Sequence, residues 1–166
     1  MTVLIVTGGI GSGKSLVSRM LTDCYGIPVY EADSRAKALY VEIPEMIDQM
    51  ESRLGVNLKD SQGVFEPQKL AEVIFNDSCA LKKVEEIVFP KLHEDFLKWA
   101  SAQEKDVVAL ESATLLEKSY FDGFGDIVLV VDAPRSLRML RACARDGQDE
   151  SRILKRMDAQ PLMTSI

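Results

Sequence analysis

Cysteine and histidine are scarce in this chain of 166 residues, which has three cysteines and one histidine, His93. The cysteines, Cys24, Cys79 and Cys143, are far apart in the sequence, and no C-x-x-C pair occurs. These residues therefore do not predict a zinc site or a disulfide framework. They fit a reducing cytosol better than an oxidising compartment.

Long hydrophobic runs and an excess of positive charge are also missing. No stretch approaches the roughly 20 apolar residues of a membrane span, and the amino-terminal end lacks the basic segment of a signal peptide. The net charge of −6 argues against general nucleic-acid binding, because nucleic-acid-binding surfaces are basic. We therefore expect neither a membrane nor a nucleic-acid partner, and local positive charge must hold any anionic ligand.

The chain does contain a glycine-rich loop between a strand and a helix. Residues 3–6 form an apolar, β-branched run that predicts a buried parallel strand covered on both faces. Helical periodicity then covers about 13–24 and stops before Gly26. Between them stands Gly8-x-x-x-x-Gly13-Lys14-Ser15, which is the Walker A motif in the context that it requires.

This motif predicts how a nucleotide is bound. Backbone amides of the loop and the positive end of the following helix attract phosphate oxygens. Lys14 is expected to reach the β- and γ-phosphates of ATP, and the Ser15 hydroxyl to ligate Mg²⁺. The predicted nucleotide-binding residues are Gly9, Ile10, Gly11, Ser12, Gly13, Lys14, Ser15 and Leu16.

Asp33 is the candidate catalytic carboxylate. It follows a short predicted strand at 27–30, and ligands of open α/β sheets gather at the carboxyl ends of strands, so we expect Asp33 near the loop. There it could accept a proton from a substrate hydroxyl or hold Mg²⁺ through water. The alternative is a helix N-cap, since residues 35–40 have a helical pattern. Both interpretations stay open.

Residues 44–105 show helical patterns and no strand pattern. Helices are predicted at 44–54, 67–75 and 79–102, with a polar turn at 57–63 and a kink or break at Pro90. We interpret this region as a helical subdomain inserted between the second and third strands. In nucleotide kinases such an insert often closes over the second substrate.

Two further strands, at 107–110 and 127–132, end in acidic residues, with a short helix and loop expected at 115–125. An apolar strand ending in an acid resembles a Walker B element, which makes Glu111 and Asp132 candidates for the Mg²⁺ shell. An acid that merely belongs to a turn explains each equally well.

Basic residues gather near the end of the chain, where helices are predicted at 135–145 and 149–160. Arg138, Arg141 and Arg145 share one helix face. The face is either simply solvated or part of a lid, at about 138–150, that brings arginines onto phosphates. The order of elements predicts an α/β fold, with a parallel sheet flanked by helices.

Together these residues resemble the dephospho-CoA kinase family of P-loop kinases. The resemblance covers nearly the whole chain and includes the helical substrate domain and the lid. Its segments are TGGIGSGKS at 7–15, EADSRA at 31–36, residues 68–75, 81–83, 89–90 and 115–117, and the stretch from Val130 to Gln160. It implies a single P-loop kinase domain that transfers phosphate from ATP to the ribose 3′-hydroxyl of dephospho-CoA. Asp33, Lys14, Arg141 and Arg145 would then be catalytic.

The chain departs from the family pattern at several positions. Glu31 replaces the first Asp of D-A-D-x-x-A, Phe89 stands where a histidine is usual, and Ala113-Thr114 stands where the family has a proline. Family members continue into a final strand and helix that bracket the adenine, and this end is expected to be missing here, because the sequence stops at Ile166.

Two other functions share part of this evidence. Another small-molecule kinase, with a nucleoside, nucleotide or sugar as acceptor, would need the same loop. A GTPase-like switch needs an [NT]-K-x-D guanine reader, which the sequence lacks. Asp60-x-x-Gly63 has the D-x-x-G spacing of a switch, but it lies in the polar turn.

Overall fold

The computed structural model describes residues 1–114, 123–147 and 149–158, which form two compact units. The sheet unit comprises Met1–Glu31 and Ala102–Ile166, and the helical unit comprises Ala32–Ser101. Most of the helix and loop expected at 115–125, the family-like segment at 115–117 and Gln160 lie outside the described residues.

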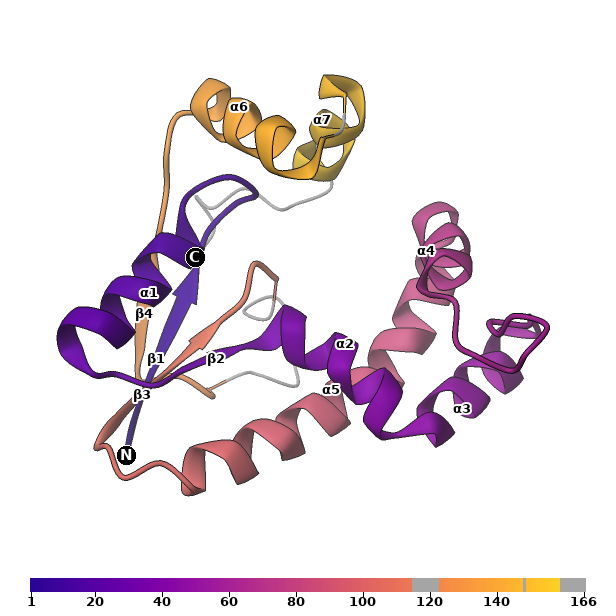
Figure 1. Cartoon of the computed structure of the whole chain (residues 1–166), viewed down its shortest axis with the longest axis horizontal. Coiled ribbons are helices and arrows are strands. Elements are labelled where there is room, and N and C mark those ends of the chain that lie inside the picture. Colours follow the sequence, from indigo (N-terminus) through magenta and orange to yellow (C-terminus); the bar gives the residue numbers. More distant parts are fainter. Residues whose placement is uncertain (115–122, 148, 159–166) are drawn as a thin grey trace. The chain divides into compact units, whose positions relative to one another are not determined.

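The sheet unit is built on four parallel strands, in the order β2-β3-β1-β4 (Figure 1). The strands are β1 (Thr2–Thr7), β2 (Val29–Glu31), β3 (Val107–Glu111) and β4 (Ile127–Val130). The register pairs Glu111 with Val6 on one side and with Glu31 on the other, so the carboxyl ends of the strands lie at one edge. The predicted α/β fold with a parallel sheet is confirmed.

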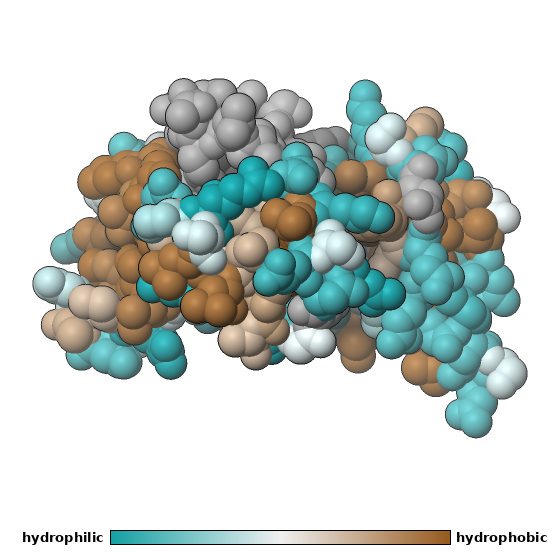
Figure 2. All heavy atoms as spheres, turned by 90° about the horizontal axis from the view of Figure 1, so that it is seen from above, coloured by the Kyte–Doolittle hydropathy of each residue, from teal (hydrophilic) through white to brown (hydrophobic). Residues whose placement is uncertain are grey.

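Burial differs between the centre of the sheet and its β4 edge. Val6, Val108 and Leu110 of the central strands are fully buried, and α1 (Lys14–Tyr25) contacts β1, β2 and β3. Every residue of β4 is at least 37% exposed, although its sequence is as apolar as that of β1. Figure 2 shows hydrophobic residues at the surface on the side where Figure 1 places α1 and β4. Within the described residues, β4 pairs with β1 alone.

A helix pair follows β4 in the sheet unit. Helices α6 (Arg135–Asp146) and α7 (Glu150–Asp158) share a small core of Ala142, Ile153 and Met157. Ile10 packs against this core. The helix pair therefore contacts the glycine-rich loop through apolar side chains.

The helical unit packs three helices against a fourth, long one. These are α2 (Ala32–Glu42), α3 (Pro44–Leu54), α4 (Pro67–Asn76) and α5 (Ser78–Ser101), and α5 contacts the other three. Its buried residues, among them Val84, Val88 and Phe96, recur at helical spacing, so that one stripe faces the core.

Pro90 does not split α5, so that part of the prediction is wrong. Proline removes the hydrogen bond to the carbonyl four residues earlier, which here belongs to Glu86. Both residues lie on the exposed face of the helix, where water can bind that carbonyl instead. The buried face is therefore not interrupted.

The start of α2 corrects two further expectations. The helix begins at Ala32, directly after β2, so Asp33 lies in its first turn and the N-cap interpretation is wrong. The helical unit also begins at Ala32 instead of near residue 44. The reason is that Leu39 of α2 is buried and that α2 packs on α3 and α5.

Candidate active site

The phosphate loop, residues 8–15, is shaped by glycines, and at two of them a side chain would have no room. Gly8 and Gly11 have φ values of +155° and +73°, which side chains disfavour. A Cβ on Gly8 would lie 2.1 Å from the carbonyl oxygen of Val131, and a Cβ on Gly11 2.1 Å from that of Arg138. The loop backbone is thus enclosed between the chain after β4 and the start of α6.

The N-terminus of α1 is free for an anion. Its N-cap is Gly13, which has no side chain to accept a hydrogen bond from the first amides, and the first turn contains no acidic residue. The Ser12 hydroxyl is buried and has no hydrogen-bond partner among the described residues. Unpaired donors and the positive end of the helix dipole therefore converge at the loop, which favours a phosphate group there.

Lys14 and Ser15 stand where α1 begins. The Lys14 ammonium donates to the carbonyl oxygens of Gly8, at 2.8 Å, and Gly9, at 3.3 Å, so it lies back along the loop. Ser15 is exposed, and its hydroxyl makes no hydrogen bond with any residue that the structure describes. Both groups are thus at the loop and accessible to a bound phosphate.

The three arginines of α6 differ in their contacts. Arg141 donates to the Ser12 carbonyl oxygen at 3.3 Å and lies over the loop. The Arg138 Nε atom is buried 3.8 Å from an Asp132 carboxylate oxygen, with no hydrogen bond to a described residue. Arg145 is bound to Asp146, and this hydrogen bond raises the pKa of Arg145. Of these three side chains, only that of Arg141 is therefore hydrogen-bonded to the loop.

The structure offers no preformed cage for a metal ion among the residues that it describes. These residues contain no group of three or more His, Cys, Asp or Glu side chains placed to hold one. Glu111 ends β3, and the Asp132 side chain, just after β4, is 67% exposed. This donor set fits Mg²⁺, which often takes one or two protein ligands together with phosphate oxygens and water. Whether Glu111 or Asp132 joins Ser15 stays a prediction.

Asp33 belongs to the helical unit, where its exposed carboxylate makes no hydrogen bond or ion pair with a described residue. It lines a cavity of about 730 Å³ formed by α2, α3, α4 and the turn at 59–65. The expected proximity of Asp33 to the phosphate loop involves both units and stays a prediction.

The cavity walls are mainly apolar, and sequence patterns did not reveal them. The apolar lining residues are Ala36, Tyr40, Val41, Pro44, Ile47, Val64, Phe65, Pro67, Leu70, Ala71 and Ile74. The rings of Tyr40 and Phe65 lie 5.2 Å apart, and burial raises the pKa of Tyr40. The wall residues come from separate elements, so no local motif marks them.

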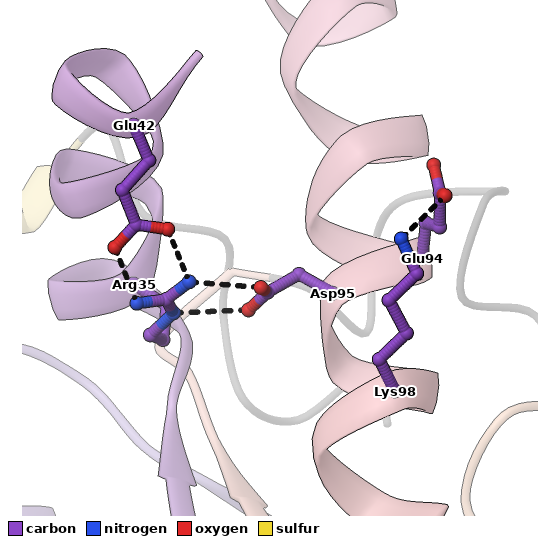
Figure 3. Close-up of polar contacts among 5 residues, drawn as sticks. All are labelled: Arg35, Glu42, Glu94, Asp95 and Lys98. Atoms are coloured by element: carbon purple, nitrogen blue, oxygen red, sulfur yellow. Dashed lines mark hydrogen bonds and ion pairs between the residues drawn. The ribbon is translucent and has the colours of Figure 1, made fainter.

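Arg35 was also not predicted, although it fixes α2 in the helical unit. It binds Asp95 of α5 through two hydrogen bonds, at 2.9 and 2.8 Å, and Glu42 through two more, each at 3.0 Å (Figure 3). The hydrogen bond with Asp95, and then that with Glu42, raises the pKa of Arg35. Arg35 and Glu42 share a face of α2 at i, i+7 spacing, but nothing in the sequence indicated Asp95.

The family follows from a comparison with known proteins. The dephospho-CoA kinase family model matches residues 2–164, which is nearly the whole chain. The chain belongs to the dephospho-CoA kinase family. It is 41% identical over 160 residues to the dephospho-CoA kinase of Porphyromonas gingivalis, covering 96% of this chain and 78% of that protein. The Chlorobaculum tepidum dephospho-CoA kinase is 37% identical over 163 residues, which cover 93% of this chain and 76% of that protein.

Two solved structures resemble the chain in fold, and one of them is a dephospho-CoA kinase. The crystal structure of TT1252 from Thermus thermophilus has a TM-score of 0.82 and 31% identity, covering 96% of this chain and 80% of that one. The dephospho-CoA kinase of Campylobacter jejuni has a TM-score of 0.61 and 25% identity, with 95% and 79% covered. The expected resemblance to this family, and the kinase class of the chain, are therefore confirmed.

Membership of a kinase family argues against the GTPase-like switch. Asp60 and Gly63 form part of a tight turn in the helical unit, where the Asp60 carboxylate accepts the amides of Gln62 and Val64. These hydrogen bonds lower the pKa of Asp60 and give the residue a structural role.

A search of the described helices for a membrane span found none with the necessary length and hydrophobicity.

Proposed function

We propose that this chain transfers the γ-phosphoryl group of ATP to the ribose 3′-hydroxyl of dephospho-CoA, giving coenzyme A and ADP in the last step of coenzyme A synthesis. The observation that carries the proposal is the match of the dephospho-CoA kinase model to residues 2–164. The phosphate loop supports it, because its enclosed glycines and uncapped helix suit a polyphosphate.

The sheet unit would bind and activate ATP. Loop amides and the start of α1 hold the β- and γ-phosphates, and Lys14 exchanges the Gly8 and Gly9 carbonyls for phosphate oxygens. Arg141, already over the loop, neutralises charge that spreads over the equatorial oxygens during transfer. Arg145 is already bound to Asp146 through Nε and Nη2, so we expect a smaller contribution from it. Mg²⁺, when bound by Ser15, would neutralise phosphate charge and orient the γ-phosphate.

Asp33 would activate the acceptor. Its carboxylate accepts the proton of the 3′-hydroxyl while that oxygen bonds to the γ-phosphorus and the bond to the departing ADP breaks. The fold supports this role, since Asp33 follows the end of β2 by two residues. Glu31 and Val6 both pair with Glu111, so the ends of β2 and β1 are two strand spacings apart, about 10 Å.

The test is coupled ADP release with dephospho-CoA and with a panel of nucleosides, nucleotides and sugars. Asp33→Asn should keep ATP binding but lower turnover about 10²–10⁴-fold, because a positioned base contributes roughly that much. Glu45→Gln, at an exposed carboxylate of α3, is the matched control and should leave turnover unchanged. Activity with another acceptor and none with dephospho-CoA would favour a different small-molecule kinase. Normal turnover by Asp33→Asn would disprove the assignment of the base.

We further propose that the reaction takes place in the cytosol, without a nucleic-acid partner. The three cysteines support this location, since all are free thiols. Pull-down of the chain from a lysate, with and without nuclease, tests whether nucleic acid binds.

A further inference from the structure

Helix α2 has two faces with different tasks. Asp33, Ala36, Lys37 and Tyr40 line the cavity, and their spacing puts them on one face. Arg35, Leu39 and Glu42 lie on the other, where Leu39 is buried and Arg35 binds α5. Because the face with Arg35 is fixed to α5, the face toward the cavity presents a carboxylate, an ammonium group and a phenol ring in order along the helix axis.

The positive charges of this cavity are not equivalent. Two lysines line it, Lys37 and Lys59. Lys59 is paired with Asp48 and with Glu51, so its charge is already neutralised. Lys37 is exposed and forms no ion pair or hydrogen bond with any described residue, Asp33 one turn earlier included. Lys37 is therefore the cation of this wall that an anionic ligand can neutralise.

Beyond Lys37 the cavity wall becomes apolar and is left partly uncovered. Val41 is 78% exposed and Val64 58% exposed, although both line the cavity. They lie near the paired rings of Tyr40 and Phe65 in the sequence. Exposed apolar side chains in a concave site gain free energy when an uncharged ligand covers them.

We propose that Lys37 binds the diphosphate of the acceptor and that the apolar wall next to it takes the uncharged pantetheine arm. This inference rests on the proposed function, since dephospho-CoA carries its diphosphate between the ribose and that arm. Asp33 and Lys37 are four residues apart, about 6 Å along the helix axis. A few covalent bonds separate the ribose 3′-hydroxyl from the 5′-phosphate, so one nucleotide can reach both side chains.

Lys37 would then discriminate among acceptors. A charge-assisted hydrogen bond to phosphate is stronger than a neutral one, and it is lost when the acceptor lacks phosphate. The contact is made equally before and during transfer, so its loss should raise KM and leave kcat nearly unchanged. Asp33 should show the opposite pattern, because it acts on the reacting proton.

The experiment compares two fragments of the acceptor, 4′-phosphopantetheine and pantetheine, in calorimetric binding without ATP. Wild-type protein should bind the phosphorylated fragment about tenfold more tightly or better, as expected for a charged hydrogen bond. Lys37→Gln should abolish this preference, and Lys37→Arg should retain it. Lys82→Gln, at an exposed lysine of α5 that does not line the cavity, is the control for net charge and should retain it.

Kinetics with dephospho-CoA separates this inference from the function on which it rests. Lys37→Gln should raise KM about tenfold with kcat within about twofold of wild type. Equal KM values in Lys37→Gln and Lys82→Gln would overturn the role of Lys37 and would leave the proposed function intact. Absence of transfer to dephospho-CoA by the wild type would overturn the proposed function. The preference for 4′-phosphopantetheine over pantetheine would still show whether Lys37 binds the phosphate. Far-UV circular dichroism verifies that the variants fold.

Discussion

The two units of this protein prepare for ligands in different ways. In the sheet unit the phosphate loop relies on its backbone, since Gly8 and Gly11 are enclosed by carbonyl groups and Gly13 leaves the start of α1 uncapped. In the helical unit the cavity relies on side chains from three helices and a turn, and Arg35 fixes the helix that carries Asp33 and Lys37. A backbone site is sensitive mainly to added atoms, and a side-chain site to removed ones.

The largest effect should come from Lys14, the lysine of the phosphate loop. Lys14→Met removes an ammonium group that contacts the loop carbonyls of Gly8 and Gly9. We expect kcat to fall about 10²–10³-fold, the usual cost of losing one charged contact in the transition state. Stopped-flow measurement of phosphoryl transfer tests this, and an unchanged melting temperature shows that the fold is intact. Nearly normal transfer would mean that Lys14 does not reach the γ-phosphate.

Adding one methyl group to the loop should have the next largest effect. Gly11→Ala would place a Cβ 2.1 Å from the Arg138 carbonyl oxygen, so α6 or the loop must move. We expect a loss of stability of about 2–3 kcal/mol and much weaker binding of an ATP analogue.

The helical unit supplies the matched control. Gly63 also has a positive φ, +81°, but a Cβ there would meet nothing within 4 Å. Gly63→Ala should cost only about 1 kcal/mol and should leave ATP binding unchanged. Thermal unfolding and titration with the analogue measure both variants, and equal losses would show that backbone strain, not the contact with α6, dominates.

Removing a side chain from the helical unit should be milder. Arg35→Met keeps the aliphatic bulk but removes the two hydrogen bonds that Arg35 donates to Asp95, whose side chain is 23% exposed. Both groups retain some solvent, so we expect a loss of about 1 kcal/mol, with a raised KM for dephospho-CoA and unchanged ATP binding.

A double-mutant cycle tests whether Arg35 acts through α5. Asp95→Asn alone should cost a similar amount, and the Arg35→Met/Asp95→Asn double variant should cost less than the two combined. Strict additivity would mean that the ion pair does not stabilise α2.

The smallest effect concerns the α6–α7 pair. Asp146 accepts hydrogen bonds from Arg145 and from Arg156 of α7, and mainly the first lowers the pKa of Asp146 below its usual 3.8. A lowered folded-state pKa stabilises the fold fully above the usual carboxyl pKa of 3.8, and this contribution is lost as the pH falls from there through the lower, folded-state pKa. Asp146→Asn should lose about 0.5–1 kcal/mol at pH 7 and less at pH 3. Melting temperatures across this range measure it, and equal losses at both pH values would contradict it.

Much of the sheet unit could be predicted from the sequence because its signals are local. Glycine spacing indicates the phosphate loop, and an apolar run followed by helical periodicity indicates β1 and α1 within a residue or two. In the helical unit, α3 was predicted to the residue, since Pro44 begins it and Gly55 ends it. These features depend on neighbours along the chain.

What could not be predicted depends on residues distant in sequence. The cavity combines α2 with Phe65 and Ile74, and Arg35 meets Asp95 sixty residues later. The alternative interpretation of Asp33 as an N-cap was wrong because α2 begins at Ala32, one residue before it. Pro90 stays within α5 because it lies on the exposed face of the helix, where the lost backbone hydrogen bond costs little free energy. The roles of Lys14, Ser15, Asp33 and Arg141 remain predictions, and the experiments above decide those of Lys14 and Asp33.

The apolar β4 has a consequence for handling the purified protein. Ile127–Val130 is a strand whose second edge has no partner among the described residues, and its side chains meet water. Such a strand can recruit a strand from another molecule, so that solutions aggregate as the concentration rises. Specific activity should therefore fall on storage at high concentration, and a lysine at Leu129 should lengthen the shelf life of the preparation.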